Sequence, residues 1–503
     1  MYFYLFAGIM TQIFGHFIII SSNHHSFLIN FFVISIILFK ERKRTKFFCT
    51  GKRMSNNQEK APKGEAFALR PVPKEEQKSW MGIVWVQSGM VICIPAFLLG
   101  SMLGEGMSTM NGIIAGVIGY LMVLLLTFIL GIQGADLHVP TCSIAQSTFG
   151  RAGTRLLVSS LFTISLMGFF GLQVNVCGEA LTSLLSNSFG IDLPVQVSSL
   201  ICGAIMVVVA VYGMELLKNV DAATVPLLFI VMVIALILAF KRYGTIGLTA
   251  NDVLEPTMNM FEGIALSFSF FSAAAFTAPD ITRFQRSRRD TILSSTIGLM
   301  PAGIATLVIG MLLSRVAGVY DITLVLSLVG LPIIGMIVLI VSATTTNALN
   351  AYCGGLDLIM TFNMPDNRRK EATAIVGIVG VILGILGILN FIEVYLGWIA
   401  FLGAPIAGVM IADYWLVGKG KAKHWHPLEG FNWAGIISTL ISLVIALFIP
   451  IGVFNFNGVI IAIIVYMIIE RFMPSKSRPS LQSQFEADAK SSEEAQTAPA
   501  EAE

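Results

Sequence analysis

The residues with the clearest chemical potential stand together inside one long apolar stretch. Five hydroxyl or amide side chains fall within six positions, namely Ser342, Thr344, Thr345, Thr346 and Asn347. Asn350 follows one turn later. A carboxamide offers a paired donor and acceptor, and hydroxyl groups add further hydrogen-bonding capacity. A single Ser or Thr in an apolar helix most often bonds its own backbone, so the prediction of a binding site rests on the cluster and its amides.

Three further apolar stretches carry polar or helix-breaking residues. The stretch from Trp80 holds Gln87, Ser88, Gly89 and Cys93 ahead of Pro95. Since proline removes a backbone donor and clashes with the preceding turn, a kink or break is expected near 92–96, where carbonyl oxygens become free to bind a cation. The other two stretches contain Phe169, Phe170 and Gln173, and Phe270 and Phe271 within "SFSFFSAAAFTAPD". Aromatic faces next to amides suit a planar, uncharged, amide-like solute.

The composition shows what kind of scaffold holds these residues. Of 503 residues, 55% are apolar and only 12% are charged, which excludes a water-soluble globular enzyme. A formal charge of +2 offers no basic field for nucleic acid. The six cysteines are scattered, without zinc-ligand spacing. The sequence therefore predicts a membrane protein without a resident cofactor.

A scan for apolar segments of about 20 residues predicts twelve membrane-spanning helices. They fall at Trp80–Leu103, Gly112–Ile132, Leu156–Leu185, Val195–Tyr212, Thr224–Phe240, Met260–Ala278, Ile292–Val316, Val325–Tyr352, Thr373–Phe391, Val394–Tyr414, Trp433–Ile451 and Phe454–Arg471. With the segment before Trp80 placed inside, 22 Lys and Arg residues fall in inside segments and three, Lys241, Arg242 and Arg315, fall outside. Both termini are therefore predicted to be cytoplasmic.

The two ends of the chain lie outside this bundle. Residues 474–503 have the composition of a disordered cytoplasmic tail. Residues 1–53 form an apolar leader with three readings: an extra membrane segment, a targeting segment, or translated upstream sequence that the cell does not make. We favour the last, because a polar amino terminus follows Met54 and the leader lacks the order of a signal peptide. The remaining parts are a cytoplasmic segment at 54–79, a ten-helix transport core at 80–413 and two C-terminal helices at 414–473.

The spacing of the four polar spans predicts an architecture. Spans one and six are five apart, as are spans three and eight. Five-plus-five inverted repeats place interrupted helices at corresponding positions, with substrate and ion near the middle of the bilayer. We therefore expect an all-α membrane protein with a 5+5 inverted-repeat core.

Several motifs give the chain a family resemblance. They include "STFGRAG" at 147–153, "GFFGLQ" at 168–173, "PDITRF" at 279–284, "TTN" at 345–347 and "GWIAFLGAPIAGVMIADYW" at 397–415. With these motifs the sequence resembles the nucleobase:cation symporter-1 family, in its branch of cytosine and purine-cytosine permeases. The resemblance covers most of the chain from Pro71 to the last span. It implies a ten-helix, 5+5 inverted-repeat core of the sodium-symporter type plus two peripheral helices. It also implies transport of a nucleobase or related heterocycle together with a cation, and no enzymatic activity.

The resemblance also assigns site residues. Those implied for the substrate are Phe169, Gln173, Phe271, Asn347, Asn350 and, in the upper wall of the pocket, Cys93. Those implied for Na⁺ are Gly89 and Ile92 in span one and Ser342, Thr345 and Thr346 in span eight. Of these, Asn347 is expected to bind the base, and the loss of its side chain to abolish uptake.

Some alternatives stay open. A symporter of the same fold could carry an amino acid, an osmolyte, allantoin, a hydantoin or a vitamin-precursor pyrimidine, and the coupling ion could be H⁺. The expected surroundings are a small nucleobase-like solute and the lipid bilayer of the cell membrane, with no nucleic acid, and the expected state is a monomer.

Overall fold

The computed structural model describes residues 69–473 apart from 213, 246–247, 249–251, 254, 320–321 and 450–451. All of these belong to one compact unit, Lys63–Glu503. The predicted leader at 1–53 and tail at 474–503 lie outside the described residues. The described part is built from helices, as the composition predicts, with a single isolated bridge between Lys78 and Gln285 in place of a sheet.

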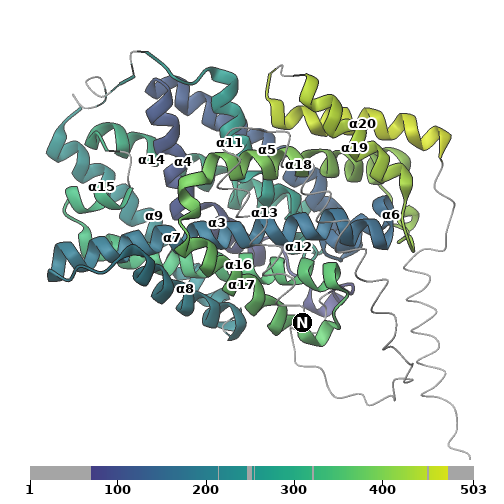
Figure 1. The fold of residues 1–503 in the computed structure, drawn as a ribbon, viewed down its shortest axis with the longest axis horizontal. Helices are drawn as coiled ribbons and strands as arrows, with labels where there is room; N and C mark the ends of the chain where they lie inside the picture. The colour runs from purple at the N-terminus through teal and green to yellow at the C-terminus, as the bar shows by residue number, and fades with distance from the viewer. Residues whose placement is uncertain are drawn as a thin grey trace, which may run out of the picture. The chain divides into compact units, whose positions relative to one another are not determined.

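The helices form two packed groups (Figure 1). The first group is α3 (Met81–Val91), α4 (Ile94–Gly106), α5 (Thr109–Leu137), α11 (Met260–Phe276), α12 (Ala278–Thr282), α13 (Arg288–Gly298) and α14 (Met300–Ala317). The second is α7 (Ser160–Phe189), α8 (Val195–Tyr212), α16 (Pro332–Phe362) and α17 (Arg369–Ile385). The strongest packing is between α5 and α11 in the first group and between α7 and α16 in the second. Spans one, two, six and seven thus form one body, and spans three, four, eight and nine form another.

The remaining helices lie around these two groups. They are α6 (Thr141–Gly153), α9 (Met214–Tyr243), α15 (Ile322–Leu328), α18 (Ile392–Ile411), α19 (Trp433–Phe448) and α20 (Phe454–Phe472). The last two lie beside each other against α18, at the yellow end of the chain in Figure 1. They occupy the peripheral position that the sequence predicts for the two C-terminal helices.

Eight described helices are long and apolar enough to cross a membrane, and the bent pair α3 and α4 gives a ninth. The other three predicted spans correspond to the shorter helices α11, α17 and α19, which have 17, 17 and 16 residues. The chain is therefore a multi-pass membrane protein with an all-helical fold. The exact count of twelve spans stays a prediction.

The predicted start and end of span eight are wrong. Helix α15 ends at Leu328, the backbone turns at Gly330 with φ of 88°, and α16 begins at Pro332 and continues to Phe362. Glycine accepts this positive φ at no steric cost, and proline is well placed at the first turn of a helix. The span therefore ends ten residues beyond Tyr352 and takes in Asp357.

Hydrogen bonds sort the loops onto two ends of the bundle. At one end, the Val72 amide donates to the His138 carbonyl at 2.9 Å and the Lys78 amide to the Phe284 carbonyl at 2.6 Å. We call this the basic end, because its loops are those predicted to hold the 22 basic residues. At the opposite end, Asp252 accepts from the Thr109 amide at 2.8 Å. Asp252 also pairs there with the buried Arg315 at 3.4 Å. These bonds place the segments around Val72, His138 and Phe284 at one end and those around Thr109, Asp252 and Arg315 at the other.

Close helix packing in the first group depends on glycine. A Cβ atom added to Gly100 on α4 would lie 2.2 Å from the Leu307 carbonyl oxygen on α14. One added to Gly310 would lie 2.2 Å from the Phe97 carbonyl oxygen. The two backbones therefore touch where neither residue has a side chain, which is the usual way in which membrane helices approach closely.

Candidate functional site

Span one is broken where the sequence predicts. Helix α3 ends at Val91, Ile92 has φ −89° and ψ 75°, and Cys93 is extended with φ −138° and ψ 160°. Pro95 stands in the first turn of α4. Because proline has no amide hydrogen, the helical ladder cannot continue through it. The break leaves the carbonyl oxygens of Gly89 and Ile92 available to side chains of another helix.

Those two carbonyls meet the hydroxyl cluster of α16. The Ser342 hydroxyl donates to the Ile92 carbonyl at 3.2 Å. The Thr346 hydroxyl donates to the Gly89 carbonyl at 3.1 Å and also lies 3.1 Å from the Ser342 carbonyl. The structure therefore brings together four of the five residues predicted to bind Na⁺, Gly89, Ile92, Ser342 and Thr346. Their four oxygens are neutral, buried and contributed by both packed groups.

The remaining hydroxyls of the cluster bond within their own helix. Thr345, the fifth predicted ligand, donates to the Ser342 carbonyl at 2.8 Å and is buried. Thr344 donates to the Ile340 carbonyl at 2.7 Å. Thr344 and Thr346 therefore make different hydrogen bonds. The Thr346 hydroxyl links α16 to span one, whereas, among the described residues, the Thr344 hydroxyl bonds only the backbone of its own helix.

Asn347 is the middle residue of α16, with fifteen residues of the helix on either side. Its Nδ2 donates to the Phe170 carbonyl on α7 at 3.0 Å and lies 3.1 Å from the Met206 sulfur on α8. Its Oδ1 accepts from Asn350 at 3.2 Å. Because Asn347 is fully buried, its amide fixes α16 against α7 and orients Asn350, which is half-buried.

The predicted residues of α7 lie next to this junction. The half-buried Phe169 ring meets Tyr395 edge to face, with centroids 5.9 Å apart. Gln173 stands one turn further along the same face, because residues four apart share a helix face. Its Oε1 is buried and has no hydrogen-bond partner among the described residues. A buried acceptor without a donor is costly, so this oxygen is poised to accept from a ligand.

The two other predicted residues lie on the far side of the break. Phe271 packs edge to face on Tyr120, with centroids 4.7 Å apart, and belongs to α11, which is unbroken through Phe276. Tyr120 interacts electrostatically with Cys93. The Cys93 thiol lies 3.6 Å from the Met90 carbonyl. Phe271 and Cys93 therefore both belong to the first packed group, and Tyr120 is the aromatic partner of Phe271 there. In span six, α11 is continuous through Phe276, and Thr277, with φ −98° and ψ 9°, separates it from α12.

Two polar residues of span one have structural partners. The Gln87 amide donates to the Ser295 hydroxyl at 3.0 Å, and the Ser88 hydroxyl donates to the Gly298 carbonyl at 2.8 Å. Both partners lie in or next to α13. These bonds hold spans one and seven together within the first packed group.

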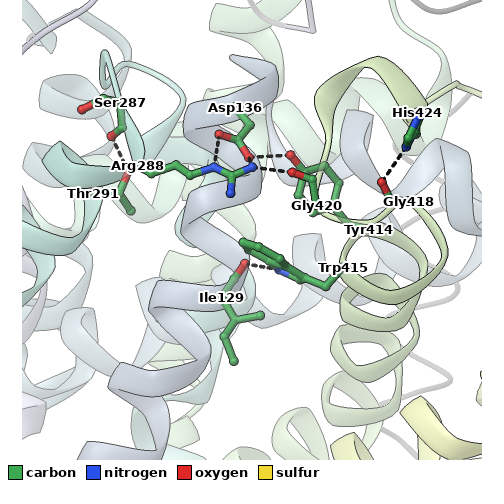
Figure 2. Close-up of polar contacts among 10 residues, drawn as sticks. All are labelled: Ile129, Asp136, Ser287, Arg288, Thr291, Tyr414, Trp415, Gly418, Gly420 and His424. Atoms are coloured by element: carbon green, nitrogen blue, oxygen red, sulfur yellow. Dashed lines mark hydrogen bonds and ion pairs between the residues drawn. The ribbon is translucent and has the colours of Figure 1, made fainter.

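A polar junction at the basic end joins spans two, seven and ten. Figure 2 shows Arg288 reaching Asp136, with its Nε 2.9 Å from Oδ1 and its Nη2 2.7 Å from Oδ2. Asp136 also accepts from the Tyr414 hydroxyl, and the guanidinium donates to the Gly420 carbonyl. Arg288 lies over the Trp415 ring, 5.3 Å from its centroid. The "ADYW" segment predicted as part of a family motif thus anchors the end of α18 to the first packed group.

Sequence reasoning missed two buried carboxylates, Asp280 on α12 and Asp357 on α16, each 1% exposed. Asp357 was placed in a loop by the early end of the predicted span eight. A lone charged residue within an apolar helix is a recognised sign of function, and it would have been visible with the correct boundary.

Comparisons with known proteins agree with this arrangement. Residues 71–469 match the family model described as permease for cytosine/purines, uracil, thiamine, allantoin. The cytosine permease of Escherichia coli K12 is 26% identical over 424 residues, which cover 82% of this chain and 96% of that protein. The allantoin permease of Bacillus subtilis is 21% identical over 458 residues, covering 80% and 92%.

A solved structure shows a similar fold. Mhp1, a nucleobase-cation-symport-1 family transporter in a closed conformation with bromovinylhydantoin bound, superposes with a TM-score of 0.70 at 18% identity. The match covers 81% of this chain and 96% of that one.

Proposed function

Because this chain belongs to the family of permeases for cytosine/purines, uracil, thiamine and allantoin, we propose that it imports a nucleobase or a related planar heterocycle by symport with Na⁺. As a member of this family it is a transporter and not an enzyme. The observation that carries the proposal is the junction of Ser342 and Thr346 with the carbonyls of Ile92 and Gly89.

The junction has the chemistry of a sodium site. Carbonyl and hydroxyl oxygens are hard, neutral ligands, which suit a hard monovalent ion. Each hydroxyl now donates its hydrogen to a carbonyl of span one. When Na⁺ binds, each hydroxyl turns its hydrogen away, so that hydroxyl and carbonyl oxygens both face the ion. Thr345, buried one turn from Ser342, is the fifth ligand in this proposal.

The substrate site lies beside the ion on the α7 face. Phe169 supplies a ring for stacking, and Gln173 and Asn350 supply amide groups for the edge of a heterocycle. Asn347 acts by orienting Asn350 and by holding α16 against α7. Phe271 and Cys93 form the wall on the other side of the span-one break.

The position of the ion explains coupling. Gly89 and Ile92 belong to the first packed group, and Ser342 and Thr346 belong to the second. An ion bound to all four therefore stabilises one relative position of the two bodies. Rocking of one body against the other then exposes the site to alternate sides, which is the cycle expected of a 5+5 inverted-repeat transporter. The coupling is reciprocal, so the heterocycle raises Na⁺ affinity by the same factor.

The proposed orientation places the basic end in the cytoplasm. The described loops at this end are among those predicted to carry 22 of the 25 counted basic residues, and cytoplasmic loops carry the Lys and Arg excess. Both termini are then cytoplasmic in the cell membrane, and a monomer holds every residue of the site.

Uptake into proteoliposomes tests this proposal. Radiolabelled cytosine, uracil, hypoxanthine and allantoin are offered to the purified protein with an inward gradient of Na⁺ or of choline. We expect accumulation of at least one heterocycle with Na⁺ and none above protein-free vesicles with choline. Accumulation of amino acids without any heterocycle would refute the substrate class, and equal uptake in choline would refute Na⁺ coupling.

A further inference from the structure

Two buried carboxylates at the basic end take no part in the proposed ion or substrate site. Asp280 lies on α12, beyond the end of α11, and Asp357 lies in the last two turns of α16. Both helices pack against α6, whose adjacent residues Thr141 and Cys142 lie against Asp280 and Asp357 respectively. They therefore face each other across the boundary between the two packed groups.

The two carboxylates have unequal surroundings. Asp280 Oδ1 accepts from the Thr141 amide at 2.7 Å, at the start of α6, where the helix dipole favours negative charge. The charge of Arg283 also favours its ionised form, although burial raises the pKa of Asp280 above its ordinary value. Among the described residues, neither oxygen of Asp357 has a nitrogen or oxygen partner. The weak thiol donor of Cys142 is the compensating group beside it.

The positive charges that the described residues place on elements packed around the pair include Arg283, Arg369 and Arg155, and Arg155 donates to the Thr361 carbonyl on α16 at 3.3 Å. Arg283 donates to the Asp280 carbonyl at 3.2 Å and to the Tyr352 hydroxyl at 2.8 Å. Its own carbonyl meets His138 Nδ1 at 3.0 Å. From α17, Arg369 lies over the Tyr352 ring, and Cys353 on α16 is also close enough to interact with both carboxylates. Burying a second ionised carboxylate without a hydrogen-bond donor is strongly unfavourable. The neutral form of Asp357 avoids this cost.

We propose that Asp280 and Asp357 form a proton-binding site that links closure of the basic end to uptake of one proton. When this end is closed, Asp357 holds the proton on one oxygen and Asp280 holds the negative charge. When this end opens, water reaches Asp357, the O–H bond breaks and the proton passes to water. No other bond changes. Acid therefore favours closure of this end, and alkali favours its opening.

The cover over the pair is the segment that would have to move. Residues 72–78 lie across this end through the Val72 to His138 bond and the Lys78 to Phe284 bond. His138 in turn contacts the carbonyl of Arg283. Opening of this end breaks the two backbone hydrogen bonds made by Val72 and Lys78 and separates α12 from α16.

Labelling of a native cysteine, Cys353, measures the opening of this end, so no cysteine has to be introduced. The full-length protein in lipid nanodiscs is treated with N-ethylmaleimide between pH 5.5 and 8.5, and labelling of Cys353 is followed by peptide mass spectrometry. At each pH, the labelling rate of the wild type is divided by that of Asp357→Asn. This ratio cancels the ordinary rise of thiol reactivity with pH, which both proteins share. If one proton controls opening, this ratio rises by up to about tenfold per pH unit. An ionised Asp357 next to Cys353 would by itself slow labelling of the wild type and lower the ratio. A rise of the ratio therefore shows that the reagent reaches Cys353 more easily.

Two matched variants separate the site from a general effect of charge. Asp280→Asn leaves one carboxylate for Arg283 to neutralise, so its Cys353 labelling is expected to lose the wild-type pH dependence as well. Asp413→Asn alters another carboxylate at the same end, one that accepts from Ser147 at 2.7 Å, Thr148 at 3.0 Å and Tyr466 at 2.8 Å. This variant is expected to keep the wild-type profile. Melting temperatures show that each variant is folded.

The proposal rests on the proposed transport cycle for the statement that this end opens, but the assay needs neither substrate nor Na⁺. A ratio of Cys353 labelling rates that does not change with pH would overturn the proton site. So would an equal rise with pH of the same ratio measured at Cys177 on α7. Neither result would bear on the proposed symport. If Asp357→Asn fails to fold, the Asp280→Asn variant decides the question. The proton site is overturned if the pH dependence of its Cys353 labelling equals that of the wild type and of Asp413→Asn. Failure of heterocycle uptake with a rising ratio would instead refute only the proposed substrate.

Discussion

Replacing Thr346 by alanine removes one oxygen from the proposed sodium site and leaves the helix intact. The Thr346 hydroxyl is the group that joins α16 to the Gly89 carbonyl, at 3.1 Å. Alanine favours the helix more than threonine does, so the helix itself is not weakened. The change therefore acts on the junction between the two packed groups.

The expected size of the effect follows from the bonds that are lost. Loss of the bond to Gly89 costs about 1 kcal/mol of stability, the ordinary net value of a neutral hydrogen bond. Loss of a ligand to a charged ion costs about 1.5–3 kcal/mol by analogy with hydrogen bonds to charged groups. Because about 1.4 kcal/mol corresponds to a tenfold change in affinity, half-saturation by Na⁺ should rise by about tenfold to about a hundredfold.

The measurement is heterocycle uptake as a function of Na⁺ concentration, for Thr346→Ala, Thr346→Ser and Thr344→Ala. Thr344→Ala is the matched control, because this hydroxyl bonds the Ile340 carbonyl of its own helix at 2.7 Å. We expect a raised half-saturating Na⁺ concentration in Thr346→Ala alone, recovery in Thr346→Ser, and near-normal affinity for the heterocycle once Na⁺ is saturating. An unchanged Na⁺ dependence with weaker heterocycle binding at every Na⁺ concentration would assign Thr346 to the substrate and refute the ion site.

Three further predictions concern the substrate face, helix packing and the junction at the basic end. Asn350→Ala should weaken heterocycle binding with little change in melting temperature. Asn347→Ala should abolish uptake and also lower the free energy of unfolding by about 1–3 kcal/mol, because it leaves buried polar groups without partners. Normal uptake in Asn347→Ala would contradict its assignment. Gly100→Ala should lower the melting temperature through about 1–3 kcal/mol of overpacking, while Gly397→Ala, with nothing within 4 Å of the added Cβ, should not; equal effects would show that α4 and α14 can separate freely. Arg288→Lys should cost about 1 kcal/mol in thermal unfolding, because lysine cannot make the two-pronged contact to a carboxylate, and a wild-type melting curve would refute the importance of that contact.

The sequence was sufficient to predict features that depend on local chemistry. The break in span one follows from Pro95 alone, and the structure confirms it at Ile92 and Cys93. The alternation of basic loops predicted which loops share an end, and their hydrogen bonds agree. The all-helical fold follows from the length and hydropathy of the apolar segments.

Features that depend on tertiary contacts were less accessible. The predicted limits of span eight missed the turn at Gly330 and the continuation to Phe362, so Asp357 was placed in a loop. The spacing of polar spans suggested an interrupted helix in span six, whereas α11 is continuous through Phe276. The role of Asn347 in binding the base stays a prediction, and its bond to the Phe170 carbonyl was not accessible from the sequence because it depends on where α7 lies. Sequence pattern identifies a polar side chain at membrane depth, and only packing decides which partner it has.

Cooperative binding of Na⁺ and a heterocycle is tested most directly by thermal unfolding of the purified protein. The melting temperature is measured against a panel of nucleobases, hydantoins, allantoin and amino acids, in NaCl and in choline chloride. A ligand that binds only the folded state at a hundred times its Kd adds about 2.7 kcal/mol of stability. We predict that at least one planar heterocycle raises the melting temperature in NaCl and that this rise is lost or much reduced in choline chloride. A rise with amino acids and none with any heterocycle, or an equal rise in both salts, would contradict the proposed symport.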